Sequence, residues 1–237
     1  KNEEKKERER EGAVNGTQED TAQVLDMAEA ATSISVGLID LIKLGALLSA
    51  VVLYASPLPE IREVATTGSL GDRSFLPYAA MWISAAAWVV YGFCTFDIFP
   101  TVITNAVGLV CSSYYCNVYI QHVSKSDHLR TTSRIFGTCV VTIGVFGIYC
   151  LTTGEEKASV IYRAGILASA LNVAQYSSPL VELRMVVRRR STESMSPALT
   201  AAGTLCSSLW TTYGFIQGDP FQYGPNGLGL VAALVQV

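Results

Sequence analysis

Charge is scarce over most of this sequence. Of its 237 residues, 16% are charged and half are hydrophobic, and a dense mixed-charge run occupies residues 1–19. Long later stretches carry almost no charge, as in membrane proteins, because few side chains can bring a charge into hydrocarbon. The net charge of −3 therefore says little about partners, and no nucleic-acid partner is expected.

Residues typical of catalysis or metal binding are also few. The sequence has two histidines, His122 and His128, in one predicted loop, and it lacks a C-x-x-C pair, a phosphate-cradling glycine loop and a nucleophile–base pattern. We therefore predict no enzyme activity, no metal site and no cofactor. The six cysteines lie in or beside apolar segments and are interpreted as small buried hydrophobic residues, with a disulfide between helix ends as the alternative.

The first 32 residues lack apolar periodicity, and no cleavable signal peptide is visible. We interpret residues 1–33 as a polar extracellular tail and expect it to be disordered, since it has little apolar surface to bury. Asn15-Gly16-Thr17 in this tail is a glycosylation sequon.

The rest of the chain contains seven apolar segments, each close to the roughly 20 residues that a bilayer-spanning helix needs. These segments predict an all-α membrane protein with seven transmembrane helices. They lie at about 36–58, 75–95, 98–120, 134–152, 158–181, 197–216 and 220–237.

A hexamer of the pattern W-x-x-Y-G-F occurs twice, at Trp88–Phe93 and again 122 residues later at Trp210–Phe215. The same offset relates Ser56-Pro57-Leu58 to Ser178-Pro179-Leu180, and Asp97 to Asp219. Asn105 and Gly108 return as Asn226 and Gly229, with the register shifted by one. Matches spread over about 50 residues indicate an internal duplication.

The duplication covers segments one to three and five to seven, and it leaves segment four without a counterpart. We therefore predict three-helix repeats at 34–121 and 154–237, joined by a linker at 122–153 that contains helix four. Because three is odd, the extra helix gives both repeats the same sense across the membrane, so they are expected to be parallel repeats.

Basic residues concentrate on one side of the predicted membrane, since the 1–2, 3–4 and 5–6 connections carry nine and the others only Lys157. Cytoplasmic loops are enriched in Lys and Arg, so we predict an external N-terminus and a cytoplasmic C-terminus, in the plasma membrane. The nine residues are Arg62, Arg73, Lys125, Arg130, Arg134, Arg184, Arg188, Arg189 and Arg190.

Two asparagines at equivalent places are the first candidates for binding. Asn105 and Asn226 are expected to face each other across the pseudo-twofold axis, where an amide offers two donors and two acceptors without a charge. Such a pair suits a ligand rich in hydroxyls. The alternative is that each amide bonds a neighbouring helix.

Trp88 and Trp210 lie 17 and 16 residues before these asparagines. An indole face packs against the C–H face of a sugar ring, and its N–H can donate to a hydroxyl. The alternative is a tryptophan in the interfacial belt, but both residues lie nearer mid-span than either helix end.

Prolines and tyrosine–aspartate pairs suggest moving parts. Proline removes a helix hydrogen bond, so Pro57, Pro77, Pro179 and Pro197 are candidate hinges near the cytoplasmic helix ends, or residues that only begin or end helices. Tyr91 and Asp97 lie near one membrane face, with Tyr213 and Asp219 at the matching place, and these four residues are expected to form hydrogen bonds that close the external mouth.

At these residues the sequence resembles the SWEET family of sugar transporters over about residues 36–237. The most specific matches are Ser178-Pro179-Leu180, Trp210–Gly214, and Asp219-Pro220-Phe221 leading to Pro225–Gly229. The resemblance implies a uniporter that carries mono- or disaccharides in either direction by alternating access.

The resemblance also implies roles for individual residues. Asn105 and Asn226 match the family's sugar-contacting pair, with Trp88 and Trp210 flanking the sugar. Tyr91 and Asp219 match extracellular gate residues, and Pro57, Pro77 and Pro179 match three of four hinge prolines. The fourth is expected at Ser196, whereas this chain has proline at 197.

Two other functions stay open at this point. A PQ-loop amino-acid exporter has the same helix plan, but its Pro-Gln signature is replaced here by Pro57-Leu58 and Pro179-Leu180. Its proton coupling would also need a titrating group in the membrane, for which only Asp40 is a candidate. The second alternative is a sugar-binding membrane protein that does not transport. A sugar, the lipid bilayer and a second copy of the chain are the expected partners.

Overall fold

The computed structural model describes residue 29 and residues 32–123, 126–175 and 197–236, and every element in these ranges is helical. The chain divides into two compact units, Lys1–Leu41 and Ile42–Val237. Most of the predicted tail, with Asn15, Pro179 and the basic residues at 184–190, lies outside the described residues. Residues 32 and 33, which the sequence assigns to the disordered tail, belong instead to the first helix.

Helices occupy all seven predicted segments of the described chain. The first lies at residues 32–55 and is followed, after a turn at 56–57, by α2 (Leu58–Thr67). The others are α3 (Leu76–Thr95), the π-helix η1 (Ile98–Val102) continuing into α4 (Ile103–His122), α5 (Ser126–Thr152), α6 (Lys157–Gln175), α8 (Pro197–Gln217) and α9 (Pro220–Gln236).

The predicted start of the fourth helix is wrong. Helix α5 begins at Ser126 rather than near 134, so Arg130, Arg134 and His128 lie on this helix, and His122 is the last residue of α4. The two histidines therefore do not share a loop. Hydropathy locates the apolar part of a helix, whereas the backbone hydrogen bonds of α5 continue through two further polar turns.

Two equivalent turns join helices within the predicted repeats. Phe96, after α3, and Gly218, after α8, are 122 residues apart and have left-handed φ values of 61° and 65°. The next residues repeat the same backbone contact, because the Asp97 and Asp219 amides donate to the Gly92 and Gly214 carbonyls, both at 2.9 Å. A bulky residue such as Phe96 rarely adopts this conformation. The Phe96 ring also has a partner, because the Lys157 ammonium lies 4.2 Å from its centroid.

The glycines of the repeated hexamer permit this tight return. A Cβ atom on Gly92 would lie 2.7 Å from Val102 Cγ2, and one on Gly214 would lie 2.6 Å from the Tyr223 nitrogen. Because no real Cβ tolerates such contacts, each glycine lets the following helix pack directly against its own helix.

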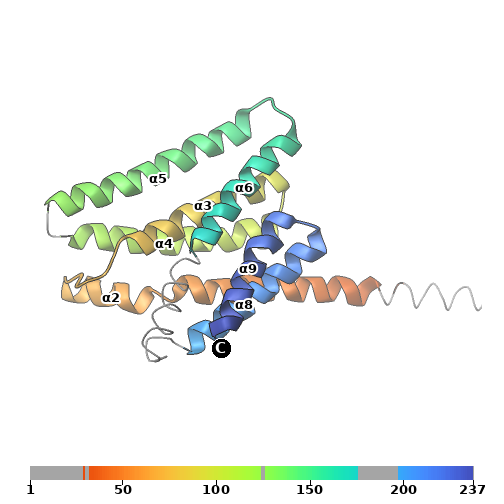
Figure 1. The fold of residues 1–237 in the computed structure, drawn as a ribbon, viewed down its shortest axis with the longest axis horizontal. Helices are drawn as coiled ribbons and strands as arrows, with labels where there is room; N and C mark the ends of the chain where they lie inside the picture. Colours follow the sequence, from red (N-terminus) through yellow and green to blue (C-terminus); the bar gives the residue numbers. More distant parts are fainter. Residues whose placement is uncertain (1–28, 30–31, 124–125, 176–196, 237) are drawn as a thin grey trace, which may run out of the picture. The chain divides into compact units, whose positions relative to one another are not determined.

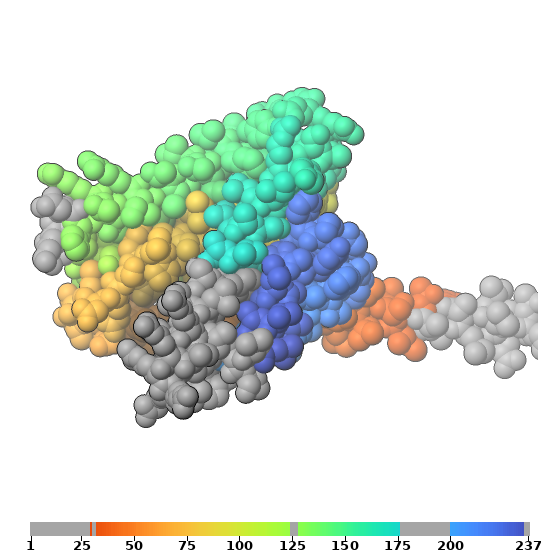
Figure 2. Space-filling view, viewed as in Figure 1, coloured from red at the N-terminus to blue at the C-terminus, as the bar shows by residue number. Residues whose placement is uncertain are grey.

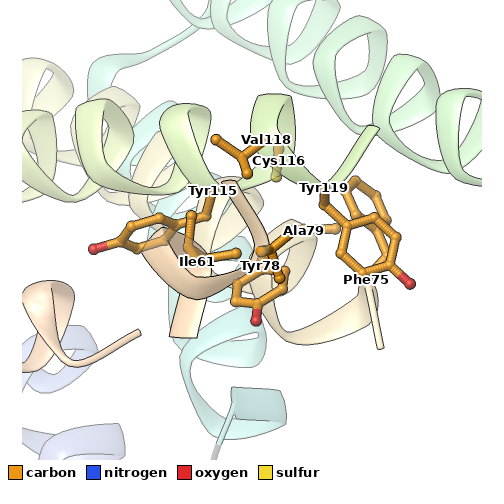
Figure 3. Close-up of a cluster of buried hydrophobic side chains, with 9 residues drawn as sticks. Ile61, Phe75, Tyr78, Ala79, Tyr115, Cys116, Val118 and Tyr119 are labelled. Carbon is orange, nitrogen blue, oxygen red and sulfur yellow. The ribbon is translucent and has the colours of Figure 1, made fainter. Parts of the chain in front are cut away.

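Within the unit Ile42–Val237, α3 packs against α4, α5 and α6, while α9 packs against α6 and α8 (Figure 1). A buried aromatic cluster joins α2, α3 and α4 (Figure 3), and its members include Ile61, Tyr78, Tyr115 and Tyr119. The rings of Tyr78 and Tyr115 meet edge to face with centroids 6.0 Å apart, a favoured aromatic geometry.

Large apolar side chains cover the outside of several helices. On α5, which lies along one edge of the view in Figure 2, Val141, Ile148 and Leu151 are 64%, 64% and 75% exposed. Water would penalise such a surface, whereas lipid would not. Among the described residues, Thr32–Thr67, Leu76–Thr95 and His128–Thr152 are long and apolar enough to cross a membrane.

The other predicted spans are helical but do not reach the same combination of length and hydropathy in the described part of the chain. Helix α9 has 17 residues, and α4 buries the polar side chains of Thr104, Asn105 and Ser112. Polar groups that face other helices lower a helix's mean hydropathy without exposing it to water.

Candidate functional site

The four predicted gate residues come together as two crossed pairs. The Tyr91 hydroxyl donates to Asp219 Oδ2 at 2.7 Å, and the Tyr213 hydroxyl interacts electrostatically with the Asp97 carboxylate. Each tyrosine of one predicted repeat therefore meets the aspartate of the other. Tyr91 and Tyr213 are 2% and 1% exposed, so neither hydroxyl can exchange its partner for bulk water without movement.

The two aspartates are held differently, although they are equivalent in sequence. Asp219 Oδ1 accepts from the Phe221 and Gln222 backbone N–H groups, at 2.9 and 3.3 Å, and so caps the start of α9. Asp97 Oδ2 instead accepts from Thr101 Oγ1 at 2.5 Å and from Gln222 Nε2 at 3.2 Å.

Asn105 is buried on α4, and its side-chain amide makes two hydrogen bonds within the protein. Its Nδ2 donates to the Thr101 carbonyl at 2.9 Å, and its Oδ1 accepts from the Tyr54 hydroxyl at 2.9 Å. A carboxamide has two donors and two acceptor lone pairs, so these two bonds leave one N–H and one lone pair for a ligand.

Asn226 repeats one of these bonds on α9, because its Nδ2 donates to the Gln222 carbonyl, four residues earlier, at 2.8 Å. The preceding residue, Pro225, lies inside the helix and has no N–H for the Phe221 carbonyl. Ser169 on α6 takes that place, since its Oγ donates to the Phe221 oxygen at 2.9 Å. The polar backbone beside Asn226 is thereby satisfied from a neighbouring helix.

Both predicted binding tryptophans are 7% exposed and face the protein interior. Trp88 packs with Ala164 and Ala168 of α6, and Trp210 packs with Ala46 and Ala50 of the helix at 32–55. Ala46 and Ala168 are themselves 122 residues apart, so the contact repeats. The indole N–H of Trp210 donates to the Ala46 carbonyl at 3.2 Å and is not free for a ligand in this conformation.

The described hinge candidates fall into two groups. Pro57 follows the helix at 32–55, and its carbonyl accepts from the Ile61 N–H at 3.1 Å, so it interrupts one helix and starts α2. Pro77 and Pro197 lie in the first turn of α3 and at the start of α8, where proline is tolerated without loss of a helix bond.

Sequence reasoning missed three residues at this site. Tyr54 bonds Asn105, and Thr101 and Gln222 bond Asp97. For Tyr54 a signal existed, because it returns 122 residues later as Tyr176 in front of the repeated Ser-Pro-Leu. Thr101 and Gln222 are 121 residues apart but differ chemically, so no repeat comparison would have selected them.

The described residues line hollows elsewhere, such as one of about 230 Å³ between the ends of α3 and α5 and the start of α6. A second, shallower hollow lies on α5. None of Trp88, Asn105, Trp210 and Asn226 lines either hollow. The predicted convergence of these four side chains on one cavity stays a prediction.

These observations define a polytopic integral membrane protein: its helices have exposed apolar faces, its sequence has an internal repeat, and neutral polar groups are buried between the repeated segments. A family model described as "Sugar efflux transporter for intercellular exchange" matches residues 40–127 and 163–237. The chain belongs to this family, the SWEET transporters, which confirms the resemblance found in its sequence.

Individual relatives agree with the family match. The chain is 27% identical over 190 residues to "Bidirectional sugar transporter SWEET7" of Arabidopsis thaliana, covering 79% of this chain and 74% of the relative. It is 29% identical over 188 residues to "Sugar transporter SWEET1" of Mus musculus, covering 78% and 82%. The fold is similar to that of a eukaryotic SWEET transporter structure, with a TM-score of 0.75 at 21% identity, covering 84% of this chain and 95% of that one.

Proposed function

We propose that this protein is a sugar uniporter that carries mono- or disaccharides in either direction across a membrane by alternating access. The observation that carries the proposal is the crossed gate, Tyr91 with Asp219 and Tyr213 with Asp97, which ties the two predicted repeats together. Membership of a family whose relatives are named as sugar transporters supports the same conclusion.

The binding site consists of Asn105 and Asn226, with Trp88 and Trp210 beside them. Each asparagine keeps unused hydrogen-bonding capacity after its bond to the carbonyl four residues earlier. Sugar hydroxyls replace water at these amides, and the apolar face of the ring packs on an indole. Affinity is weak, because a uniporter must release its cargo as readily as it binds; millimolar binding corresponds to only about 4 kcal/mol.

The crossed pairs act as one gate, and the described conformation has it closed. Opening requires the Tyr91 hydroxyl to leave Asp219, and the repeats then rock about the interruption at Pro57, with Pro77, Pro179 and Pro197 as further candidate hinges. We place the gate on the external face, with the N-terminus outside in the plasma membrane, from the distribution of basic residues. The Arg163 side chain, near the same end, is neutralised by Glu155 at 2.7 Å.

Sugar flux into liposomes tests the function. Purified full-length protein in liposomes should accelerate equilibration of glucose, fructose, galactose or sucrose, with no requirement for a proton gradient. Flux that needs an imposed pH gradient, or flux of amino acids instead, would favour the PQ-loop exporter. Binding without flux would favour the non-transporting alternative.

A further inference from the structure

Both predicted binding amides are connected to one carboxylate oxygen. Asn105 Nδ2 bonds the Thr101 carbonyl at 2.9 Å, and Thr101 Oγ1 bonds Asp97 Oδ2 at 2.5 Å. Asn226 Nδ2 bonds the Gln222 carbonyl at 2.8 Å, and Gln222 Nε2 bonds the same Asp97 Oδ2 at 3.2 Å. A chain of hydrogen bonds therefore runs from each amide, through one residue, to the gate.

This connection breaks the symmetry of the repeats. In Asp219, the equivalent of Asp97, Oδ1 accepts from backbone N–H groups and Oδ2 accepts from the Tyr91 hydroxyl. Asp97 Oδ2 instead accepts from side chains of both predicted repeats, and its carboxylate also interacts with the Tyr213 hydroxyl. Within the described part of the chain, the Asp97 carboxylate is therefore the group that links the two amides to each other.

Burial makes the connection stiff. Thr101 is fully buried and Gln222 is 2% exposed, so neither side chain can turn toward solvent while the helices stay packed. Gln222 Oε1 is buried without a partner among the described residues, which leaves the bond to Asp97 as the one that fixes its side-chain amide. Hydrogen bonds to an ionised group in a buried network are among the stronger ones.

We propose that Thr101 and Gln222 are positioning residues that couple the binding amides to the gate through Asp97. A displacement of Asn105 or Asn226 by a ligand then loosens the hold of Asp97 on Tyr213, and closure of the gate reorients the amides. The proposal rests on the proposed function only in taking a sugar as the ligand. The coupling itself is a property of the free protein.

Tryptophan accessibility tests the coupling without any sugar. The chain has three tryptophans, so a Trp82→Phe background leaves Trp88 and Trp210, whose rings pack on Tyr91 and Tyr213 with centroids 5.4 and 6.0 Å apart. Opening the gate exposes these indoles to acrylamide. Thr101→Val, which removes one donor at constant shape, should shift the population at least about tenfold toward the quenchable state, and Thr101→Ser should restore the wild-type population.

Matched controls separate coupling from general loosening. Thr104→Val removes a buried hydroxyl that has no partner among the described residues, and it should leave quenching unchanged. Gln222→Glu puts an acceptor against Asp97 and should open the gate further. Gln217→Glu alters a side chain whose amide donates to the Tyr213 hydroxyl at 3.3 Å, and it should have a smaller effect. Equal quenching in Thr101→Val and Thr104→Val would overturn the proposal.

Transport supplies an independent readout. Thr101→Val should lower the half-saturating sugar concentration on the gate side and raise it on the opposite side, each by about tenfold. A wild-type protein without sugar flux would defeat the proposed function, while the quenching result would still decide the coupling. A drop in maximal rate with both half-saturation values unchanged would identify Thr101 as a merely structural residue.

Discussion

At the scale of single residues, the site is built from neutral donors around two carboxylates. The described partners of Asp97 and Asp219 are hydroxyls, an amide and backbone N–H groups. Each such bond is worth about 1.5–3 kcal/mol when one partner is charged. The loss of a single hydroxyl is therefore enough to change which conformation dominates.

Tyr91→Phe tests this at the gate. The variant keeps the ring that packs on Trp88 and Phe221 but loses the donor to Asp219. We expect the closed state to lose about 2 kcal/mol of stability, so that the ratio of open to closed protein rises more than tenfold. Acrylamide quenching of Trp88 and Trp210 measures that ratio. Tyr114→Phe, on an exposed side chain with no described hydrogen bond, is the control and should behave as wild type.

Asn226→Ala tests the binding site. The substitution removes the side-chain amide but leaves the Gln222 carbonyl within the helix, so the fold should survive. Sugar uptake should fall by about tenfold or more, which corresponds to a loss of at least about 1.4 kcal/mol of binding free energy. Asn117→Ala, on an exposed face of α4, is the matched control. Unchanged uptake in Asn226→Ala, at normal membrane levels, would remove this residue from the site.

At the scale of elements, close approach of helices depends on glycine in the repeated hexamer. Gly214→Ala would place its Cβ 2.6 Å from the Tyr223 nitrogen, which is backbone and cannot rotate away. We expect the thermal unfolding of purified protein to show a loss of about 1–3 kcal/mol, the usual cost of overpacking.

Gly203→Ala provides the comparison on the same helix. Nothing lies within 4 Å of the added Cβ, and alanine is favoured over glycine in helices by about 1 kcal/mol. The two changes should therefore shift the unfolding temperature in opposite directions. A loss of stability in Gly203→Ala would contradict the packing of α8.

The sequence predicted the elements better than their ends. Each of the seven apolar segments contains a helix in the described chain, but α2 and the polar start of α5 carried no hydropathy signal. The repeat identified Tyr91 with Tyr213 and Asp97 with Asp219 as equivalent residues, and the family resemblance selected Tyr91 and Asp219, but the repeat alone did not predict which tyrosine meets which aspartate. That pairing depends on which helices pack together, and no local pattern encodes it.

At the scale of the whole molecule, the exposed apolar side chains require lipid. Leu151 and Ile34 are 75% and 72% exposed, and in water such surfaces associate. We expect the protein to remain with membranes through an alkaline carbonate wash and to enter solution only with detergent. Release by carbonate alone would contradict an integral location.

The two tryptophans predicted to bind sugar pack between the predicted repeats rather than within one of them. Trp88 of the first packs on α6 of the second, and Trp210 packs on the helix at 32–55. Trp88→Ala should weaken uptake less than Asn226→Ala, because it removes packing and stacking but no amide. Normal uptake would place Trp88 outside the sugar path.

The unequal anchoring of Asp97 and Asp219 has a consequence for how such a carrier diversifies. Asp219 Oδ1 accepts from main-chain N–H groups, which every residue except proline keeps, whereas Asp97 Oδ2 accepts from side chains that mutation can replace. Under the proposed coupling, substitutions at positions 101 and 222 change the rate of turnover while the proposed sugar-binding residues stay the same, so that rate and selectivity evolve separately.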